Sequence, residues 1–539
     1  MITFVRIPAI NSNSLIINKP MKKNNMYITS LLFSASLCLS TACSVDSGLN
    51  IQPDVKPEVP TPSPTPQAKK VKTFTTTSDG FMQLVQKDIP LKTGTSTAPS
   101  TILIDDKNVG QEIDGFGFAI TYSTCYNLLH MSAADRADFL KRTYSETEGY
   151  GVSYARISIG CSDFSSTEYT LCDEKGLEHF RLYKDETDYV IPILKEILAI
   201  NPKLKIVAAP WTCPRWMKVT DLTFKLPKNS WTDGHVNPKY YTDYANYFVK
   251  FVQAMKAEGI DIYAVSPQNE PLNRGNCAST YMSWQEQAEF VKELAKAFKK
   301  NALKTKIYLY DHNYDYDLKK NPGQEDYPVK IYNALGNEFE GSEYVVGAAY
   351  HDYGGSNTEL DDIYAKAPEK ELIFTESSIG EWNKGRNLSA RLLPDMKNII
   401  LGTVNRQCKA VLVWNLMLDE KKGPNLDGGC QTCYGAVDIA SDYKTLHRNS
   451  HYYIISHISS VVRPGAVRIK NSGRSARIKD VDYSTFRNPD SSYGIVLANS
   501  GGLDQMITVS NGTHNFQVKV PAEGVVSCIW NPSVTSQKD

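Results

Sequence analysis

The sequence predicts an α/β fold: a (β/α)8 TIM barrel with an attached β-sandwich domain formed by both flanks of the barrel. The first observation is that eight short apolar runs alternate with amphipathic segments across the middle of the 539-residue chain. The second is that short alternating stretches with polar turns precede and follow this region. A chain of this length suits one large barrel plus an accessory module.

The eight apolar runs are the predicted barrel strands. Each is rich in β-branched residues and ends in polar, Gly or Pro residues. They span residues 113–121, 154–160, 205–211, 262–271, 306–312, 344–353, 371–378 and 410–418. Between them, segments 240–259 and 283–300 repeat apolar residues every three or four positions, which predicts helices.

Strands that alternate with helices form parallel sheets. Eight such units favour a closed barrel over an open doubly wound sheet. No Gly-rich GxGxxG motif opens a predicted helix, which argues against a dinucleotide-binding domain. We therefore assign residues 113–449 to the catalytic barrel.

The flanks of the barrel read as antiparallel β-structure, because short alternating runs are separated by Asn, Gly and Ser turns. The runs are 71–77 and 100–106 before the barrel, and 466–470, 493–500, 506–510, 516–521 and 524–530 after it. We assign residues 71–112 and 450–539 to the N-terminal and C-terminal parts of one β-sandwich.

Residues 1–43 predict an N-terminal extension and a lipoprotein signal peptide. Lys22 and Lys23 precede an apolar run at 26–39 that is too short to span a bilayer stably. Cys43 follows a small-residue exit and resembles a lipobox cysteine, so we expect lipidation at Cys43; plain secretion is the alternative. Residues 44–70 form a Pro-rich linker with an extended, polyproline-like form.

Composition bears on the partners of the protein. The 59 Lys and Arg residues balance 59 Asp and Glu residues, whereas a nucleic-acid-binding surface needs concentrated positive charge. The 31 Tyr and 7 Trp residues supply flat faces on which sugar rings stack. We expect the protein to act on a glycan substrate, without a cofactor and without binding nucleic acid. We also expect it to be a monomer that is exported to the cell surface or the periplasm. It would touch a membrane only through its lipid anchor.

The cysteines fit export. Nine follow Cys43, an odd number, so at least one is free or paired between chains. Cys430 and Cys433 form a lone CxxC motif, and zinc would need a second pair of ligands nearby. A loop disulfide is therefore favoured over free thiols, and both are favoured over a metal site.

The active sites of (β/α)8 barrels lie at the C-terminal ends of the strands, so the residues at those ends are the candidates. They are Arg156 and Asp163 after strand two, Trp211 after strand three, Asn269 and Glu270 at the end of strand four, His351 and Tyr353 at strand six, Glu376 at strand seven, and Trp414 at strand eight.

Two carboxylates, Glu270 and Glu376, would share the mouth of the barrel with aromatic and hydrogen-bonding side chains. A retaining glycosidase needs one carboxyl group that donates a proton to the leaving oxygen and one carboxylate that attacks the anomeric carbon. Ordinary alternatives exist: either glutamate could be salt-bridged, Arg156 and Asp163 could pair across the barrel top, Trp211 could anchor the core, and His351 could be structural.

Several motifs, taken in order, resemble those of glycoside hydrolase family thirty, which includes glucosylceramidases and β-1,6-glucanases. They are GFGFAIT (115–121), RISIGCSDFS (156–165), APWTCPRWMK (209–218), SPQNEP (266–271), YHDYGG (350–355), FTESSIG (374–380), VWNLMLDEKKGPN (413–425) and YYIISHISSVVRPGAVRI (452–469). The resemblance covers about residues 71–531.

The resemblance implies a (β/α)8 barrel with a β-sandwich and retention of configuration through a glycosyl-enzyme intermediate. It implies that Glu270 is the general acid/base and Glu376 the nucleophile. Asp163, Trp211, Asn269, His351, Tyr353 and Trp414 would contact the sugar, with Arg156 bracing the subsite. We expect the pKa of Glu270 to be raised by burial and by the neighbouring negative nucleophile.

The sequence also departs from the glucosylceramidase pattern. Asp352 stands between His351 and Tyr353 where an aromatic residue is common, and the loop after strand eight carries the DGGCQTC insertion. These features resemble the β-1,6-glucan-cleaving branch, so we predict an endo-β-1,6-glucanase. The alternatives are a glucosylceramidase, an exo-acting β-xylosidase or β-fucosidase, and a non-catalytic glycan-binding surface lipoprotein.

Overall fold

A computed structural model describes residues 69–314, 319–470, 473–474 and 478–533, and these described residues belong to one compact unit. The predicted signal peptide, lipidated Cys43 and all but the last two residues of the Pro-rich linker lie outside the described residues. Among the described helices, none is both long enough and apolar enough to cross a bilayer.

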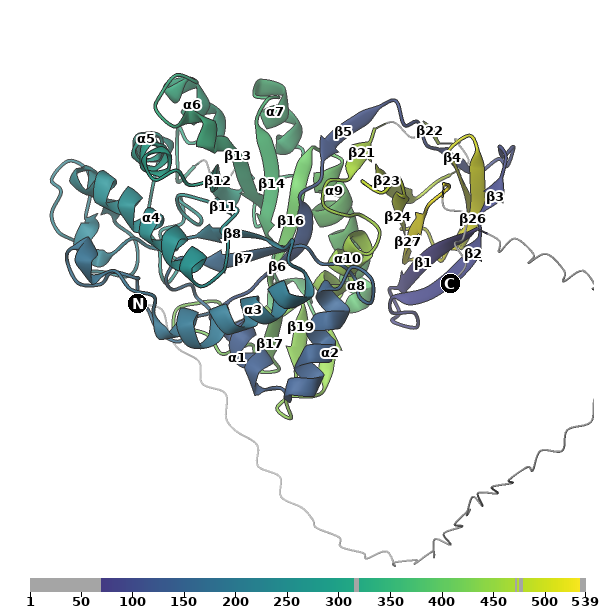
Figure 1. The fold of residues 1–539 in the computed structure, drawn as a ribbon, viewed down its shortest axis with the longest axis horizontal. Coiled ribbons are helices and arrows are strands. Elements are labelled where there is room, and N and C mark those ends of the chain that lie inside the picture. Colours follow the sequence, from purple (N-terminus) through teal and green to yellow (C-terminus); the bar gives the residue numbers. More distant parts are fainter. Residues whose placement is uncertain (1–68, 315–318, 471–472, 475–477, 534–539) are drawn as a thin grey trace, which may run out of the picture. The chain divides into compact units, whose positions relative to one another are not determined.

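Eight parallel strands close into a barrel in the order β11-β12-β13-β14-β16-β6-β7-β8 (Figure 1). Their bounds are β6 Gly115–Ala119, β7 Tyr154–Ser158, β8 Lys205–Ala209, β11 Ala264–Val265, β12 Lys306–Asn313, β13 Val345–His351, β14 Glu371–Glu376 and β16 Cys408–Asn415. Each predicted barrel run overlaps one of these strands, so the predicted fold class is confirmed.

Helices connect the strands and surround the barrel, as the amphipathic segments predict. Their bounds are α1 Tyr122–His130, α2 Ala133–Tyr144, α3 Ile191–Ile200, α4 Tyr241–Ala257, α5 Trp284–Lys300, α6 Tyr327–Leu335, α7 Glu359–Lys366, α8 Leu388–Asp395, α9 Gly402–Val404 and α10 Ser450–Ser459. At the start of α5, Ser283 and Glu286 form a reciprocal capping box.

The barrel interior is filled by side chains in layers. One buried apolar cluster consists of Tyr154, Val207, Ala264, Tyr308, Ala349, Ile373, Ala410 and Leu412. Because side chains alternate along a strand, the residue two positions after Tyr154 also faces inward; that residue is Arg156. At Gly117 a Cβ atom would lie 1.6 Å from the Tyr154 carbonyl oxygen, so only glycine lets β6 approach β7 this closely.

The β-sandwich draws strands from both flanks of the barrel, as predicted. One sheet has the order β2-β1-β27-β24-β23-β21-β5 and the other β22-β4-β25-β26-β3. The first sheet consists of β2 Val85–Pro90, β1 Lys70–Thr77, β27 Gly524–Trp530, β24 Tyr493–Asn499, β23 Val481–Arg487, β21 Val467–Ile469 and β5 Val109–Glu112. The second consists of β22 Gly473–Arg474, β4 Thr101–Leu103, β25 Gln505–Ser510, β26 His514–Val520 and β3 Lys92–Thr93.

Helix α10 ties the sandwich to the barrel. Its fully buried His457 lies between two sandwich hydroxyl groups, with Nδ1 2.8 Å from Ser527 Oγ and Nε2 2.9 Å from Thr76 Oγ1. Burial lowers the pKa of His457 to about 3, so the ring is neutral at pH 7. A neutral imidazole donates one hydrogen bond and accepts the other, which suits two hydroxyl partners.

Short strands in the loops beyond the barrel build up its C-terminal face. They are β9 Lys218–Val219 paired with β10 His235–Val236, β15 Ile379–Gly380 paired with β18 Cys433–Tyr434, and the sheet of β17 Met417–Asp419, β19 Val437–Ile439 and β20 Leu446–Arg448. Next to β18, Cys430 and Cys433 form a disulfide. This confirms the disulfide favoured by the CxxC spacing.

The position of β1 inside its sheet predicts the outcome of truncation. Strand β1 pairs with β2 on one side and with β27 on the other, so its removal exposes the edge of β27 and the apolar face beneath. We expect a protein that begins at Lys69 to be soluble, and one that begins at Leu91 to aggregate or unfold noncooperatively. Thermal unfolding followed by circular dichroism checks this; a cooperative transition in the shorter protein would contradict it.

Candidate active site

Arg156 is the positive centre of the site. It is fully buried inside the top of the barrel at the end of β7, and its guanidinium donates to three groups. Nη1 donates to Glu376 Oε2, while Nη2 donates to Asn269 Oδ1 at 2.6 Å and to Asp311 Oδ2 at 2.9 Å. One buried cation therefore orients a residue that follows β11, a residue of β12 and the last residue of β14.

Two tryptophan rings flank this guanidinium. The Arg156 carbon Cζ lies 5.0 Å from the ring centre of Trp211 and 5.6 Å from that of Trp414. The two rings are tilted by 30° with their centres 5.3 Å apart. Both side chains are buried, so each serves the packing of the barrel top as well as any sugar that binds there.

Glu376 ends strand β14 with a partner on each carboxylate oxygen. Arg156 holds Oε2, and the Tyr353 hydroxyl donates to Oε1 at 2.8 Å. Burial raises the pKa of Glu376, and the charges of His351 and Arg156 oppose that rise. Tyr353 is 42% exposed and Glu376 is buried, so the tyrosine lies between the carboxylate and the solvent.

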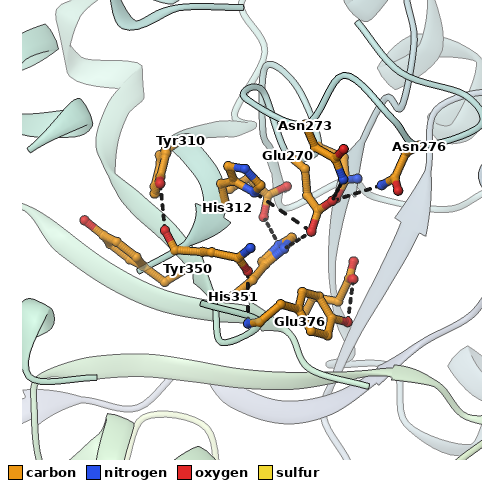
Figure 2. A network of polar contacts seen from close by, with 12 residues as sticks. Glu270, Asn273, Asn276, Tyr310, His312, Tyr350, His351 and Glu376 are labelled. Carbon is orange, nitrogen blue, oxygen red and sulfur yellow. Dashed lines mark hydrogen bonds and ion pairs between the residues drawn. The ribbon is translucent and has the colours of Figure 1, made fainter. Parts of the chain in front are cut away.

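Glu270 follows β11 at a sharp turn. Its backbone has a φ of 47°, in the left-handed region, and its amide donates to the Asp311 carbonyl at 2.9 Å. Figure 2 shows the side-chain partners: Asn273 and Asn276 donate to Oε2 at 2.7 and 2.9 Å, and Oε1 lies 3.3 Å from His351 Nδ1. The turn and these partners together fix where the Glu270 carboxylate lies.

His351 bridges two acidic groups beneath the mouth of the barrel. The ring is fully buried, with Nδ1 facing Glu270 and Nε2 lying 3.1 Å from Asp311 Oδ1. Burial lowers the pKa of His351, but the charge of Glu376 and the contacts with Asp311 and Glu270 outweigh burial and raise the pKa to about 9. His351 is therefore an imidazolium at pH 7.

The expected rise in the pKa of Glu270 is wrong for this structure. Burial does raise it, but the hydrogen bond from His351, the nearby histidine charges and the Asn273 amide outweigh burial and lower the pKa to about 2. The proton of the Glu270–His351 pair therefore resides on His351. The sequence showed the two glutamates but not the donors that surround one of them.

Asp163 lies on the side of the site bordered by the disulfide loop. Its carbonyl accepts from the Leu426 amide at 3.0 Å, and a Cβ on Gly429 would lie 2.8 Å from the Asp163 Cβ. Burial and the charge of Glu376 raise the pKa of Asp163 to about 8, although the Cys430 amide opposes them. The raised pKa favours the protonated form of Asp163, which can donate as well as accept a hydrogen bond.

A metal ion has one conceivable location among the described residues. Potential ligand atoms of Glu270, His312 and His351 lie within 4.8 Å of one another. However, His351 holds a proton and faces a carboxylate with each ring nitrogen, so a metal would have to displace that proton. The geometry fits a proton-holding site better than a metal site.

The structure gathers the predicted residues into one network and adds others. Arg156, Asn269, Glu270, His351, Tyr353 and Glu376 are linked by hydrogen bonds, Trp211 and Trp414 cover Arg156, and Asp163 lies by the disulfide loop. Reading the strand ends missed Asp311 and His312 at the end of β12. The same rule, applied to that strand, would have found them; Asn273 and Asn276 lie on a loop and give no such signal.

The arrangement is suited to glycosyl transfer through two carboxylates. Glu376 is fixed by partners on both oxygens, which suits a nucleophile that must present one oxygen to carbon. Glu270 has a proton source 3.3 Å away, which suits a group that gives and takes a proton. Such a pair can break a glycosidic bond in two steps.

Comparisons with known proteins agree with this chemistry. The family model described as "Glycosyl hydrolase family 30 TIM-barrel domain" matches residues 113–462, and the "Glycosyl hydrolase family 30 beta sandwich domain" model matches residues 465–528. The endo-1,6-β-D-glucanase BGN16.3 of Trichoderma harzianum is 28% identical over 498 residues, which cover 87% of this chain and 95% of the fungal protein.

Two further relatives differ in their named substrates. Putative glucosylceramidase 1 of Caenorhabditis elegans is 28% identical over 426 residues, 74% of this chain and 76% of the nematode protein. A solved structure described as the endo-β1,6-glucanase BT3312 is 56% identical, with a TM-score of 0.81, and the match covers 86% of this chain and 99% of that chain.

The network predicts a large stability cost for losing Asp311, whose side chain is fully buried between Arg156 and His351. We expect Asp311→Asn to lower the free energy of unfolding by about 3–5 kcal/mol at pH 7, because it leaves buried positive charge undercompensated. The pKa of Asp311 is depressed in the folded state, so this contribution is present above the unfolded pKa and is lost as the pH falls through the folded value.

Urea unfolding measures this cost, with Asp361→Asn as the matched control. Asp361 pairs with Arg406 on the surface and its side chain is 59% exposed, so its loss should cost less than about 1 kcal/mol. Equal effects of the two substitutions would contradict the central role of Asp311.

Proposed function

This chain belongs to glycosyl hydrolase family 30 and is a retaining glycoside hydrolase, and we propose that it is an endo-acting enzyme that cleaves β-1,6-linked glucan. The proposed substrate is supported by the 56% identity, over 86% of this chain, to a structure described as an endo-β1,6-glucanase. The reaction type, glycosidic bond cleavage with retention, is supported by the fixed positions of Glu270 and Glu376.

In the first step, Glu376 attacks the anomeric carbon and the leaving oxygen takes a proton from Glu270. Arg156 and Tyr353 each hold one oxygen of Glu376. This fixation removes rotational freedom that the carboxylate would otherwise lose on the way to the transition state. One bond forms between Glu376 and the sugar, and the bond to the leaving oxygen breaks.

The proton for that step comes from the Glu270–His351 pair. His351 passes it to Glu270 across the 3.3 Å contact, and Glu270 passes it to the leaving oxygen. In the second step a water molecule attacks the anomeric carbon, the bond between that carbon and Glu376 breaks, Glu270 accepts the water proton, and the proton returns to His351. The pair therefore begins and ends each cycle with one proton.

The charge of the site favours a positive anomeric carbon. With Glu376 ionised, the three carboxylates of Glu270, Glu376 and Asp311 exceed the two cations of Arg156 and His351 by one negative charge. A fixed excess of negative charge in a buried site stabilises the oxocarbenium-like transition state.

The alternatives differ in the leaving group or in catalysis itself. Curated relatives of equal identity include both β-1,6-glucanases and glucosylceramidases, and the more similar solved structure favours the glucan. A non-catalytic glycan-binding protein would not need two glutamates held in place by a buried cation.

We propose that Asp163, Trp211, Asn269, Tyr353 and Trp414 contact the sugar.

We also propose that the protein is exported and anchored through a lipid on Cys43, and that it acts as a monomer. The support is the sequence alone: a basic start, a short apolar run, a cysteine after a small-residue exit, and a Pro-rich spacer. Such an anchor would hold the barrel away from the membrane surface, where a polymeric glucan can reach it.

The roles of the two glutamates predict different chemical rescue. Glu376→Ala and Glu270→Ala should each lower turnover of β-1,6-glucan by at least about 100-fold. With an activated aryl glycoside, azide should rescue Glu376→Ala and give a glycosyl azide of inverted configuration, because the small anion occupies the space of the nucleophile. Glu381→Ala, which removes a surface carboxylate paired with Lys422, serves as the control. Full activity in either active-site variant would contradict the assignment.

The substrate is tested by incubating the protein with β-1,6-glucan, β-1,3-glucan, xylan and a glucosyl lipid, and resolving the products by size. We expect a ladder of short oligosaccharides from β-1,6-glucan alone. Monosaccharide as the sole first product would replace endo by exo action, and glucose released mainly from the lipid would move the chain to the glucosylceramidases.

A further inference from the structure

The two oxygens of the Glu270 carboxylate have different surroundings. Oε2 accepts from the Asn273 amide at 2.7 Å and from the Asn276 amide at 2.9 Å. Oε1 lies 3.3 Å from His351 Nδ1 and 3.9 Å from His312 Nδ1. Figure 2 shows the two asparagines converging on one end of the carboxylate and the histidines on the other.

The orientation of the Asn273 amide is set by the loop itself. Its Oδ1 accepts from the Gly275 amide at 2.9 Å, so its nitrogen faces Glu270. Its backbone amide also donates to the Glu270 carbonyl at 2.9 Å, which closes the turn after the left-handed Glu270. Asn273 therefore belongs to the same turn that places the carboxylate.

Counting lone pairs shows which oxygen is able to react. Each carboxylate oxygen can accept about two hydrogen bonds. The amide nitrogens of Asn273 and Asn276 both donate hydrogen bonds to Oε2. An amide nitrogen cannot accept a hydrogen bond, so a proton on Oε2 would face donors rather than an acceptor. At Oε1, the His351 contact at 3.3 Å uses one of the two acceptor positions, so by this count one position is left for the hydrogen of a leaving group or a water molecule.

We propose that Asn273 and Asn276 are positioning residues for the acid/base: they hold Oε2 of Glu270, so that Oε1 is the oxygen that gives and takes the catalytic proton. The inference rests on the proposed role of Glu270 as acid/base. In the step itself, Oε1 receives the proton from His351 Nδ1 and gives it to the leaving oxygen as the glycosidic bond breaks. The two amide hydrogen bonds to Oε2 persist throughout.

The asparagines also explain how Glu270 serves in the second step. Amide donors stabilise an ionised carboxylate, so they favour the form that accepts a proton from water. Both side chains are half-buried and lie between the buried carboxylate and the exposed residues Arg274 and Gly275. A substrate that reaches Glu270 therefore meets a carboxylate that is already oriented.

The test compares aryl glycosides whose phenol leaving groups differ in pKa. Acid assistance matters for a poor leaving group such as phenol and hardly at all for 2,4-dinitrophenol. We expect Asn276→Ala and Asn273→Ala to lower kcat/KM for the phenyl glycoside about tenfold or more and for the dinitrophenyl glycoside less than about threefold. A purely structural defect of the sugar site would lower both values equally.

Asn276→Asp is the decisive variant because it keeps the shape of the side chain and replaces the amide donor by a carboxylate. At pH 7 it should show the same selective loss as Asn276→Ala. Asn246→Ala, at a half-buried position of α4 whose side chain donates to the Thr242 carbonyl, controls for the loss of an asparagine elsewhere in the chain and should leave both values unchanged. Circular dichroism confirms that each variant is folded; if Asn273→Ala is not, the two Asn276 variants decide the outcome.

Two results would overturn the proposal: a loss that is equal for both leaving groups, or wild-type values in Asn276→Asp. Failure of the proposed substrate is a separate result. If the wild-type protein leaves β-1,6-glucan intact, the aryl series is made with the sugar that it does cleave, and the comparison of leaving groups stands unchanged. If Glu270→Ala shows no selective loss for phenyl glycosides, the acid/base assignment itself fails.

Discussion

The buried guanidinium of Arg156 is the interaction on which the rest of the site depends. A charge in the barrel interior is tolerated only when fixed partners compensate it, and here the partners come from three other strands: Asn269, Asp311 and Glu376. The alternation of β7 points Arg156 to the same side of the strand as Tyr154, which belongs to the apolar cluster inside the barrel. The same side chain, Arg156, therefore contributes both to the packing of the barrel and to the orientation of Glu376.

The same network makes two chemically identical glutamates different. Glu376 faces a permanent cation and a phenol, and it keeps no proton source of its own. Glu270 faces His351, whose positive charge depends on Asp311, Glu376 and Glu270 together. The proposed assignment of nucleophile and acid/base thus rests on neighbours on β7, β12 and β13 rather than on the glutamates themselves.

Much of the barrel and both candidate glutamates could be predicted from the sequence, because strand ends and periodicity are local signals. The eight barrel runs, helices α4 and α5, and both glutamates were found in this way. Strand β11 is shorter than its predicted apolar run, because the chain turns toward Glu270 after two paired residues. The polar edge strand β2 was missed because half of its residues are charged or amide-bearing. The pKa of Glu270 had the wrong predicted direction, since its donors come from a loop and from two other strands. Such contacts exist only in three dimensions.

The protonation state of His351 tests the account most directly. Nitrogen-15 NMR of histidine-labelled protein at pH 7, with His351→Gln to assign the signal, reports whether each ring nitrogen carries a proton. The account predicts that both nitrogens are protonated, and that Glu376→Gln lowers the pKa of this ring because the largest charge that raises it is removed. A neutral ring with one bare nitrogen at pH 7 would mean that His351 is not the proton source for Glu270, and would contradict the charge distribution described for the whole site.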